Sequence, residues 1–164
     1  MDGGFLGYRP SADAPPVAPL PALSEGRITL GSFNNLAKLN DATIALWARV
    51  LDAVPGARLA IKDSRLHDRT LGAALVGKFM ARGIAQERIV FVPPLPSPRE
   101  FLALYGGVDI SLDTYPYNGT TTTCEALWMG VPVVTLAGER HSSRVGASLL
   151  HRIGRDEWTA SDPA

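Results

Sequence analysis

Residues 108–136, VDISLDTYPYNGTTTTCEALWMGVPVVTL, contain a short apolar run, a polar loop, an amphipathic stretch and a second apolar run. The apolar runs predict strands at 108–112 and 133–136, and the amphipathic stretch predicts a helix at 121–129 that Gly130 ends. A strand, a helix and a second strand joined in this way form a βαβ unit with parallel strands. This stretch therefore predicts an α/β fold.

The same alternation of strand and helix patterns continues on both sides of this stretch. Further strands are predicted at 28–33, 58–62 and 89–92, and further helices at 41–54, 69–82, 98–105 and 143–153. Asn40 is the expected N-cap of the first of these helices, and Ser97 with Glu100 forms a capping box. Strands that are apolar on both faces and alternate with helices predict a doubly wound, Rossmann-like α/β domain, with a parallel sheet covered by helices on both faces.

The prolines divide the chain into an arm and a domain. Residues 1–27 contain five of the 13 prolines and show no apolar periodicity, so they predict an extended proline-rich arm. Residues 28–164 contain all the predicted strands and helices. We expect one α/β domain at 28–164, preceded by the arm.

Composition excludes several classes of protein. The 164 residues are 46% hydrophobic, and 16 Lys and Arg balance 16 Asp and Glu, so no basic surface for nucleic acid or for an acidic membrane is expected. Cys124 is the single cysteine, which excludes an internal disulfide and a cysteine-based zinc site. The chain has no run of 18 apolar residues, and its first residues lack a signal-peptide pattern. We expect a cytoplasmic protein.

The loop at 113–120 leads directly into four threonines at the start of a predicted helix. Free backbone N–H groups, the positive end of the helix dipole and the hydroxyls of Thr120, Thr121 and Thr122 together predict an anion site that suits phosphate. The alternative is a well-capped helix after a tight Asn-Gly turn.

Glu125 shares a helix face with Thr121 and Thr122. A carboxylate one turn from a phosphate site can accept hydrogen bonds from the vicinal hydroxyls of a ribose. The alternative is an acidic residue that only complements the helix dipole. Trp128 lies on the opposite side of this helix, with Cys124 and Leu127, and is predicted to be in the core.

Lys38 follows the predicted strand at 28–33, so it should lie at the carboxyl edge of the sheet, within reach of a diphosphate. The alternative is a solvated loop lysine.

Other chemistries have little support in the sequence. The three histidines, His67, His141 and His151, have no partner at helical spacing for a metal, so no metal is expected. The Gly-x-Ser-x-Gly, Walker A and Gly-x-Gly-x-x-Gly motifs are absent. A flavodoxin-like receiver needs several acids at strand ends, and only Asp113 qualifies.

Four segments resemble the O-linked N-acetylglucosamine transferase and Spindly-type family. They are GSFNNLAK at 31–38, LDTYPYNG at 112–119 with the threonine run, EALWMGVPVVTL at 125–136 and SRVGASLL at 143–150. The likeness extends from about residue 28 to residue 157. It resembles the carboxyl-terminal half of the catalytic region, which is the nucleotide-sugar-binding lobe of a GT-B glycosyltransferase, without the amino-terminal lobe.

The resemblance implies roles for particular residues. Lys38 would contact the donor diphosphate with Asn35 beside it, the run Thr120–Thr122 would hold phosphate, and Glu125 would hold the ribose. The animal enzymes carry Gln where this chain has Asn35 and His where it has Thr120, and both changes keep hydrogen-bonding capacity. Phe101 stands where the family usually has a His near the uracil, and Phe neither donates nor accepts hydrogen bonds.

The resemblance also implies an activity. The donor would be UDP-N-acetylglucosamine, or GDP-fucose in the Spindly branch, and the acceptor a Ser or Thr hydroxyl of a protein. The acceptor would dock on amino-terminal helical repeats, and the other lobe would complete the active site, so the chain alone is expected to be inactive. No cofactor is expected, and the residues do not identify the general base. A non-catalytic nucleotide-sugar-binding module, or a remnant of a transferase, is the remaining alternative.

Overall fold

The computed structural model describes residues 6–93, 95 and 97–162, and in these residues six parallel strands form one sheet in the order β3-β2-β1-β4-β5-β6. The strands are β1 (Thr29–Ser32), β2 (Arg58–Lys62), β3 (Ile89–Val92), β4 (Ile110–Leu112), β5 (Val133–Leu136) and β6 (Thr159–Ala160). The α-helices are α1 (Ala22–Glu25), α2 (Asp41–Ala53), α3 (Arg69–Met80), α4 (Pro98–Ala103), α5 (Thr121–Trp128) and α6 (Val145–Arg152). This arrangement confirms the predicted doubly wound α/β fold.

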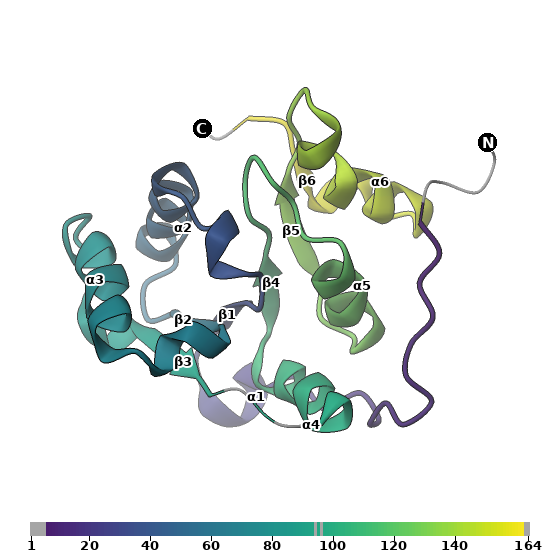
Figure 1. The fold of residues 1–164 in the computed structure, drawn as a ribbon, viewed down its shortest axis with the longest axis horizontal. Coiled ribbons are helices and arrows are strands. Elements are labelled where there is room, and N and C mark those ends of the chain that lie inside the picture. Colours follow the sequence, from purple (N-terminus) through teal and green to yellow (C-terminus); the bar gives the residue numbers. More distant parts are fainter. Residues whose placement is uncertain (1–5, 94, 96, 163–164) are drawn as a thin grey trace.

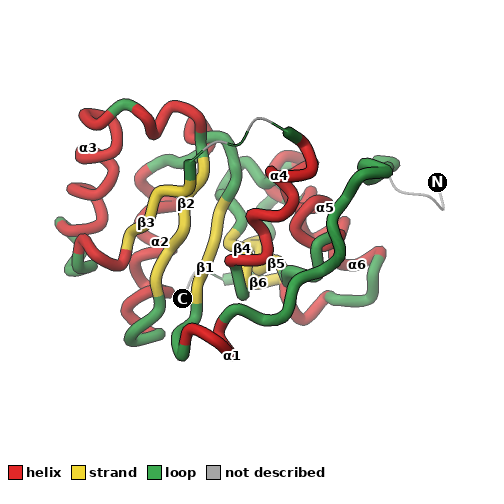
Figure 2. Tube along the Cα trace, turned by 90° about the horizontal axis from the view of Figure 1, so that it is seen from below, coloured by secondary structure: helices red, strands yellow, loops and turns green. Residues whose placement is uncertain are grey.

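Helices cover both faces of the sheet. Figure 1 shows α2 and α3 on one side of the strands and α4, α5 and α6 on the other, and Figure 2 shows the same separation from below. The chain therefore changes faces after β3, and β1 and β4 become neighbours in the middle of the sheet. The ligand site of an open α/β sheet lies at such a reversal of strand order.

Each face has its own hydrophobic core. On one face α2 and α3 pack on β1 and β2 through a cluster that includes Trp47, Leu51 and Phe79. On the other face α4 and α5 pack through Leu102, Ala126 and other buried residues. Burial of this apolar surface is the main force that stabilises a fold of this kind.

Local sequence signals place several helix ends correctly. Asn40 caps α2, because its Oδ1 accepts a hydrogen bond from the backbone N of Thr43 at 2.9 Å. Ser97 and Glu100 form the predicted capping box of α4. Gly83 follows α3 with φ of 82°, a backbone conformation that favours glycine.

Other boundaries differ from the prediction. The strand predicted at 108–112 begins at Ile110, because the backbone N of Val108 still donates to the O of Tyr105 in the preceding 3₁₀ turn, at 3.0 Å. The side chain of Asp109 accepts hydrogen bonds from the backbone N of Thr29 and of Ala22. The helix predicted at 143–153 begins at Val145, after a 3₁₀ turn. Strand β6 was not predicted, since two residues are too few to show a period.

The described part of the arm packs along the domain and contains the short helix α1, which the proline pattern did not predict. Arg99 donates a hydrogen bond to the backbone O of Asp13 at 2.9 Å, and Val17 packs beside Gly130. The arm is therefore held against α4 and α5. Among the described residues, no helix is both long and apolar enough to cross a membrane.

Candidate functional site

The loops after β1 and β4 meet at the carboxyl edge of the sheet. Nζ of Lys38, in the first loop, donates a hydrogen bond to the backbone O of Asn118 in the second, at 2.9 Å. The same ammonium lies 4.4 Å from the centre of the Tyr117 ring, a cation–π contact. Lys38 therefore lies where the sequence predicts, beside the loop that leads into the threonines.

The amino end of α5 begins with Thr120, which has non-helical backbone angles. Within the described residues, its side chain forms no capping hydrogen bond to the helix. Thr121 is exposed, and the hydroxyl of Thr122 donates to Oδ1 of Asn34 at 2.9 Å. Backbone N–H groups in the first turn of a helix have no partner within the helix, so this end can donate hydrogen bonds to an anion.

Two neighbouring amides have different surroundings. Asn34 is buried and holds Thr122, a contact that the sequence analysis missed because a polar residue after a strand gives no sign of its burial. Asn35 is exposed, and its Oδ1 accepts from the backbone N of Ala37 at 2.8 Å and from Arg65 at 2.7 Å. Asn35 thus shapes the loop that carries Lys38.

Asp63 attaches this loop to the end of β2. Its carboxylate accepts hydrogen bonds from the backbone N of Leu36 and from both the backbone and the side chain of Arg65, each at 2.9 Å. Burial acts to raise the pKa of Asp63, but these hydrogen bonds outweigh it and lower the pKa to about 2. The loop that positions Lys38 is therefore fixed to a second strand.

Glu125 lies four residues after Thr121, in the second turn of α5, and is half-buried. The Tyr105 side chain lies next to it, and the Tyr105 hydroxyl also donates to the backbone O of Thr122 at 3.1 Å. Burial raises the pKa of Glu125, and the ammonium of Lys62 partly offsets that rise. Tyr8 of the arm also lies near enough for Glu125 to act on its pKa, an approach that no local pattern predicts.

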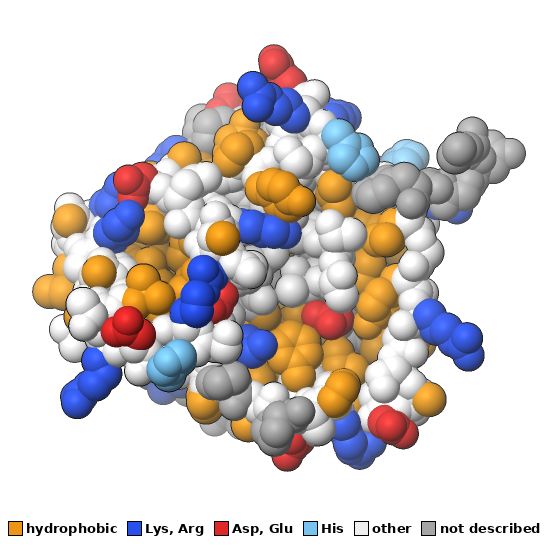
Figure 3. Space-filling view, viewed as in Figure 1, with side chains coloured by type: hydrophobic (Ala, Val, Ile, Leu, Met, Phe, Trp, Pro, Cys, Tyr) orange, Lys and Arg blue, Asp and Glu red, His pale blue; other side chains and the backbone are white. Residues whose placement is uncertain are grey.

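An aromatic cluster lies at the same edge. The ring of Phe101 is 6.0 Å from that of Phe33 and 5.9 Å from that of Tyr105. Nζ of Lys62 lies 4.2 Å from the centre of the Phe101 ring. Phe101 thus belongs to a cluster of aromatic rings close to Glu125, with one ammonium group beside it. On this face of the molecule, Figure 3 shows a hollow bordered by hydrophobic side chains and by side chains of both charges.

The sequence model of glycosyl transferase family 41 matches residues 20–164. This chain belongs to glycosyl transferase family 41. The family assignment confirms the resemblance on which the sequence analysis relies.

Two curated relatives of this family-41 chain are much longer than the chain itself. A protein of Arabidopsis thaliana, named as a probable UDP-N-acetylglucosamine–peptide N-acetylglucosaminyltransferase SPINDLY, is 45% identical over 158 residues, which are 96% of this chain and 17% of the relative. A UDP-N-acetylglucosamine–peptide N-acetylglucosaminyltransferase of Caenorhabditis elegans is 32% identical over 84% of this chain and 12% of the relative. The chain thus spans about a sixth of the length of the plant relative, and a smaller share of the animal relative.

A solved structure agrees with the family assignment. A mutant O-GlcNAc transferase of Thermobaculum terrenum superimposes with a TM-score of 0.88 at 39% identity. The match covers 94% of this chain and 29% of the other. The likeness therefore extends over the arm and the sheet together.

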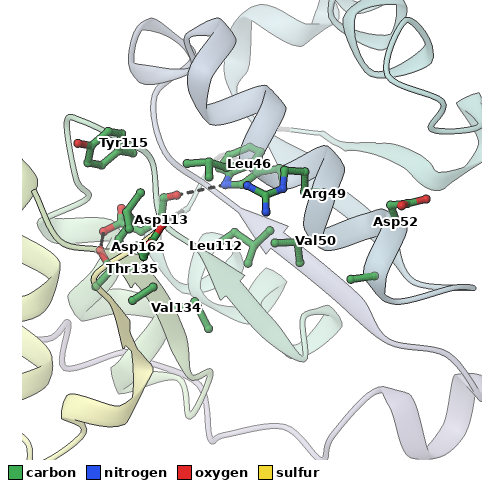
Figure 4. Close-up of a pocket in the computed structure, with 14 residues that line it drawn as sticks. Leu46, Arg49, Val50, Asp52, Leu112, Asp113, Tyr115, Val134, Thr135 and Asp162 are labelled. Carbon is green, nitrogen blue, oxygen red and sulfur yellow. Dashed lines mark hydrogen bonds between the residues drawn. The ribbon is translucent and has the colours of Figure 1, made fainter. Parts of the chain in front are cut away.

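Two other features of the family-41 chain lie apart from the predicted donor residues. Trp128, predicted to be in the core, is 51% exposed: it lies beside the arm, while Ala126 of the same turn is buried in the core. A cavity of about 480 Å³ lies between α2 and the ends of β4, β5 and β6 (Figure 4). Val134 lines it and is 40% exposed, although it lies in β5, which is paired on both sides. Of the predicted donor-binding residues, none lines this cavity.

Proposed function

We propose that this chain binds the nucleotide-sugar donor of a family-41 glycosyltransferase. UDP-N-acetylglucosamine is the proposed donor, and a Ser or Thr hydroxyl of a protein or peptide is the proposed acceptor. The observation that carries the proposal is the position of the Lys38 ammonium, bonded at 2.9 Å to the loop that leads into α5. It brings a cation and a helix amino end to one edge of the sheet.

The proposed chemistry is electrostatic. Transfer of the sugar leaves negative charge on the departing diphosphate, and an ammonium and the N–H groups of a helix end stabilise that charge. Lys38 and the first turn of α5, with Thr120, Thr121 and Thr122, supply these groups. Asn35 shapes the loop that carries Lys38, and Glu125 accepts hydrogen bonds from the ribose. This arrangement needs neither a metal nor another cofactor.

The surroundings of the chain are part of the proposal. Because the chain covers 17% of its plant relative, the proposal places the docking of the acceptor in an amino-terminal lobe and helical repeats outside the chain, and it names no general base. The balanced charge and single cysteine favour a cytoplasmic protein with no nucleic-acid or membrane partner. The chain alone is proposed to bind donor without transferring sugar.

Titration calorimetry with UDP and with uridine tests the proposal. Lys38→Ala should weaken UDP binding by about 10- to 100-fold and leave uridine binding nearly unchanged, since only UDP carries charge to neutralise. Lys78→Ala is the matched control, because Lys78 pairs with Asp41 on the exposed surface. Saturable binding of GDP in place of UDP would move the proposal to the GDP-fucose branch. Absence of heat with either nucleotide at millimolar concentration, in folded protein, would overturn it.

A further inference from the structure

The buried carboxylate of Asp113 is bonded to the loop at 114–119, which leads into α5. Oδ1 of Asp113 accepts hydrogen bonds from the backbone N of Gly119 at 2.6 Å and of Thr114 at 2.8 Å, and its Oδ2 accepts from the hydroxyl of Thr135 at 2.8 Å. Figure 4 shows the contact with Thr135, across two strands of the sheet. One carboxylate therefore fixes both ends of the loop at 114–119, immediately before α5.

Helix α6 and strand β5 pack closely against the carboxylate of Asp113. A Cβ on Gly146 would lie 2.7 Å from Oδ2 of Asp113 and would overlap Thr135, so α6 approaches the carboxylate through a residue without a side chain. Asn118 connects the end of the loop to its beginning, because its Nδ2 donates to the backbone O of Thr114 at 2.9 Å. Asp113 is 8% exposed, so neighbouring groups stabilise most of its charge in place of bulk water.

The ammonium of Lys38 lies close to this carboxylate, because its Nζ donates to the backbone O of Asn118 at 2.9 Å and the backbone N of the next residue, Gly119, donates to Asp113 at 2.6 Å. Burial raises the pKa of Asp113 to about 6, and its hydrogen bonds and Lys38 oppose that rise. Burial lowers the pKa of Lys38, and Asp113 opposes that change in turn. Each group therefore favours the charged form of the other. Two more charged side chains, Arg49 and Asp162, line the cavity that Asp113 also borders (Figure 4).

We propose that Asp113 is a positioning residue of the donor site. Without donor, its carboxylate acts as a counter-ion of the Lys38 ammonium, and it takes up a proton when a bound diphosphate becomes the partner of Lys38. The inference rests on the proposed function. A diphosphate bound by Lys38 brings negative charge toward Asp113 and takes over the ammonium, and both effects disfavour the carboxylate. The protonated acid keeps its contacts, because Oδ1 still accepts from two N–H groups while the new O–H donates to the Thr135 hydroxyl.

Proton uptake is measured by titration calorimetry in pairs of buffers that differ in ionisation enthalpy. UDP-N-acetylglucosamine is the probe, since its diphosphate is esterified at both ends and has no proton to exchange near neutral pH. The wild-type chain should take up a fraction of a proton per ligand, largest at about pH 6 to 7. Asp113→Asn should bind without uptake, because the amide keeps the shape and cannot titrate. Asp109→Asn, at the other end of β4, is the matched control and should leave the uptake unchanged.

A second measurement needs no variant of Asp113. The carboxyl carbon-13 resonance of Asp113 should titrate near pH 6 in the free chain and at higher pH with the probe bound. In the free chain, Lys38→Met should also raise the midpoint, and this readout is independent of any nucleotide. An unchanged midpoint in Lys38→Met, or equal uptake in wild type and Asp113→Asn, would overturn the inference. If the wild type binds no nucleotide but Lys38→Met shifts the midpoint, the proposed function fails and the counter-ion pair stands.

Discussion

Replacing Glu125 by Gln is expected to weaken UDP binding while the folded chain keeps or gains stability at neutral pH. The two effects have different origins. Hydrogen bonds from a ribose diol to a carboxylate contribute about 1.5–3 kcal/mol, so their loss should lower the affinity by about 10- to 150-fold. The amide keeps the shape of the side chain, so the loss reports the charge.

The stability term follows from burial. Because burial raises the pKa of Glu125, the folded chain holds this proton more tightly than the unfolded chain does. The contribution of Glu125 to stability therefore falls as the pH rises from the ordinary glutamate range through the raised pKa. At neutral pH the ionised side chain opposes folding, and Gln removes that cost. A residue that only complements the dipole would show the opposite sign, but the first turn of α5 holds no acidic residue and Glu125 lies in the second, where the effect has faded.

The assay combines titration calorimetry with scanning calorimetry. UDP and 2′-deoxy-UDP are titrated into wild type, Glu125→Gln and Glu87→Gln, the last an exposed control that precedes β3 at the opposite edge of the sheet. The loss in Glu125→Gln should be large for UDP and clearly smaller for the deoxy analogue, which already lacks one hydroxyl. Equal losses for the two ligands, or a lower unfolding temperature in Glu125→Gln at neutral pH, would refute the reasoning.

Two further predictions concern activity and packing. The chain alone should transfer no labelled N-acetylglucosamine to peptide libraries, because the proposed acceptor site lies outside it, and turnover without a second protein would contradict this. Gly31→Ala should destabilise the fold by about 1–3 kcal/mol in thermal unfolding, since its Cβ would lie 2.7 Å from both Cγ atoms of buried Val108. The double variant Gly31→Ala, Val108→Ala should recover part of the loss that strain causes, and wild-type stability in the single variant would show that β1 tolerates the methyl group.

Local features of the sequence account for most of the fold. The cap at Asn40, the capping box at Ser97 and the terminating Gly83 depend on residues within a few positions of one another, and all three are confirmed. Apolar periodicity predicts burial less well where contacts between distant segments decide which side chains of a helix are covered. Trp128 is on the face of α5 predicted to be apolar and buried, yet in the same turn it is Ala126 that enters the core, and Trp128 is exposed.

The site was predictable to the extent that strand ends meet at one edge of a parallel sheet. The sequence placed Lys38 beside the threonine loop on that ground, and the contact with Asn118 confirms it. The sequence could not show that Asn34 is buried or that the carboxylate of Asp113 accepts three hydrogen bonds. Except for the bond from the adjacent Thr114, these contacts join residues between 6 and 88 positions apart. The approach of Tyr8 to Glu125 likewise depends on the path of the arm.

The reversal of strand order has a mechanical consequence. The strands β1 and β4 join two halves of the sheet. Their register contains two residue pairs, as do the registers of β4 with β5 and of β5 with β6, against four between β1 and β2 and four between β2 and β3. Lys38 belongs to one half and the threonines to the other, so a nucleotide held by both would connect the two halves across the short pairing of β1 with β4. Ligand at about 100 times its dissociation constant adds about 2.7 kcal/mol to the stability of the folded chain. Slower proteolysis and a higher melting temperature would then report occupancy without any transfer of sugar.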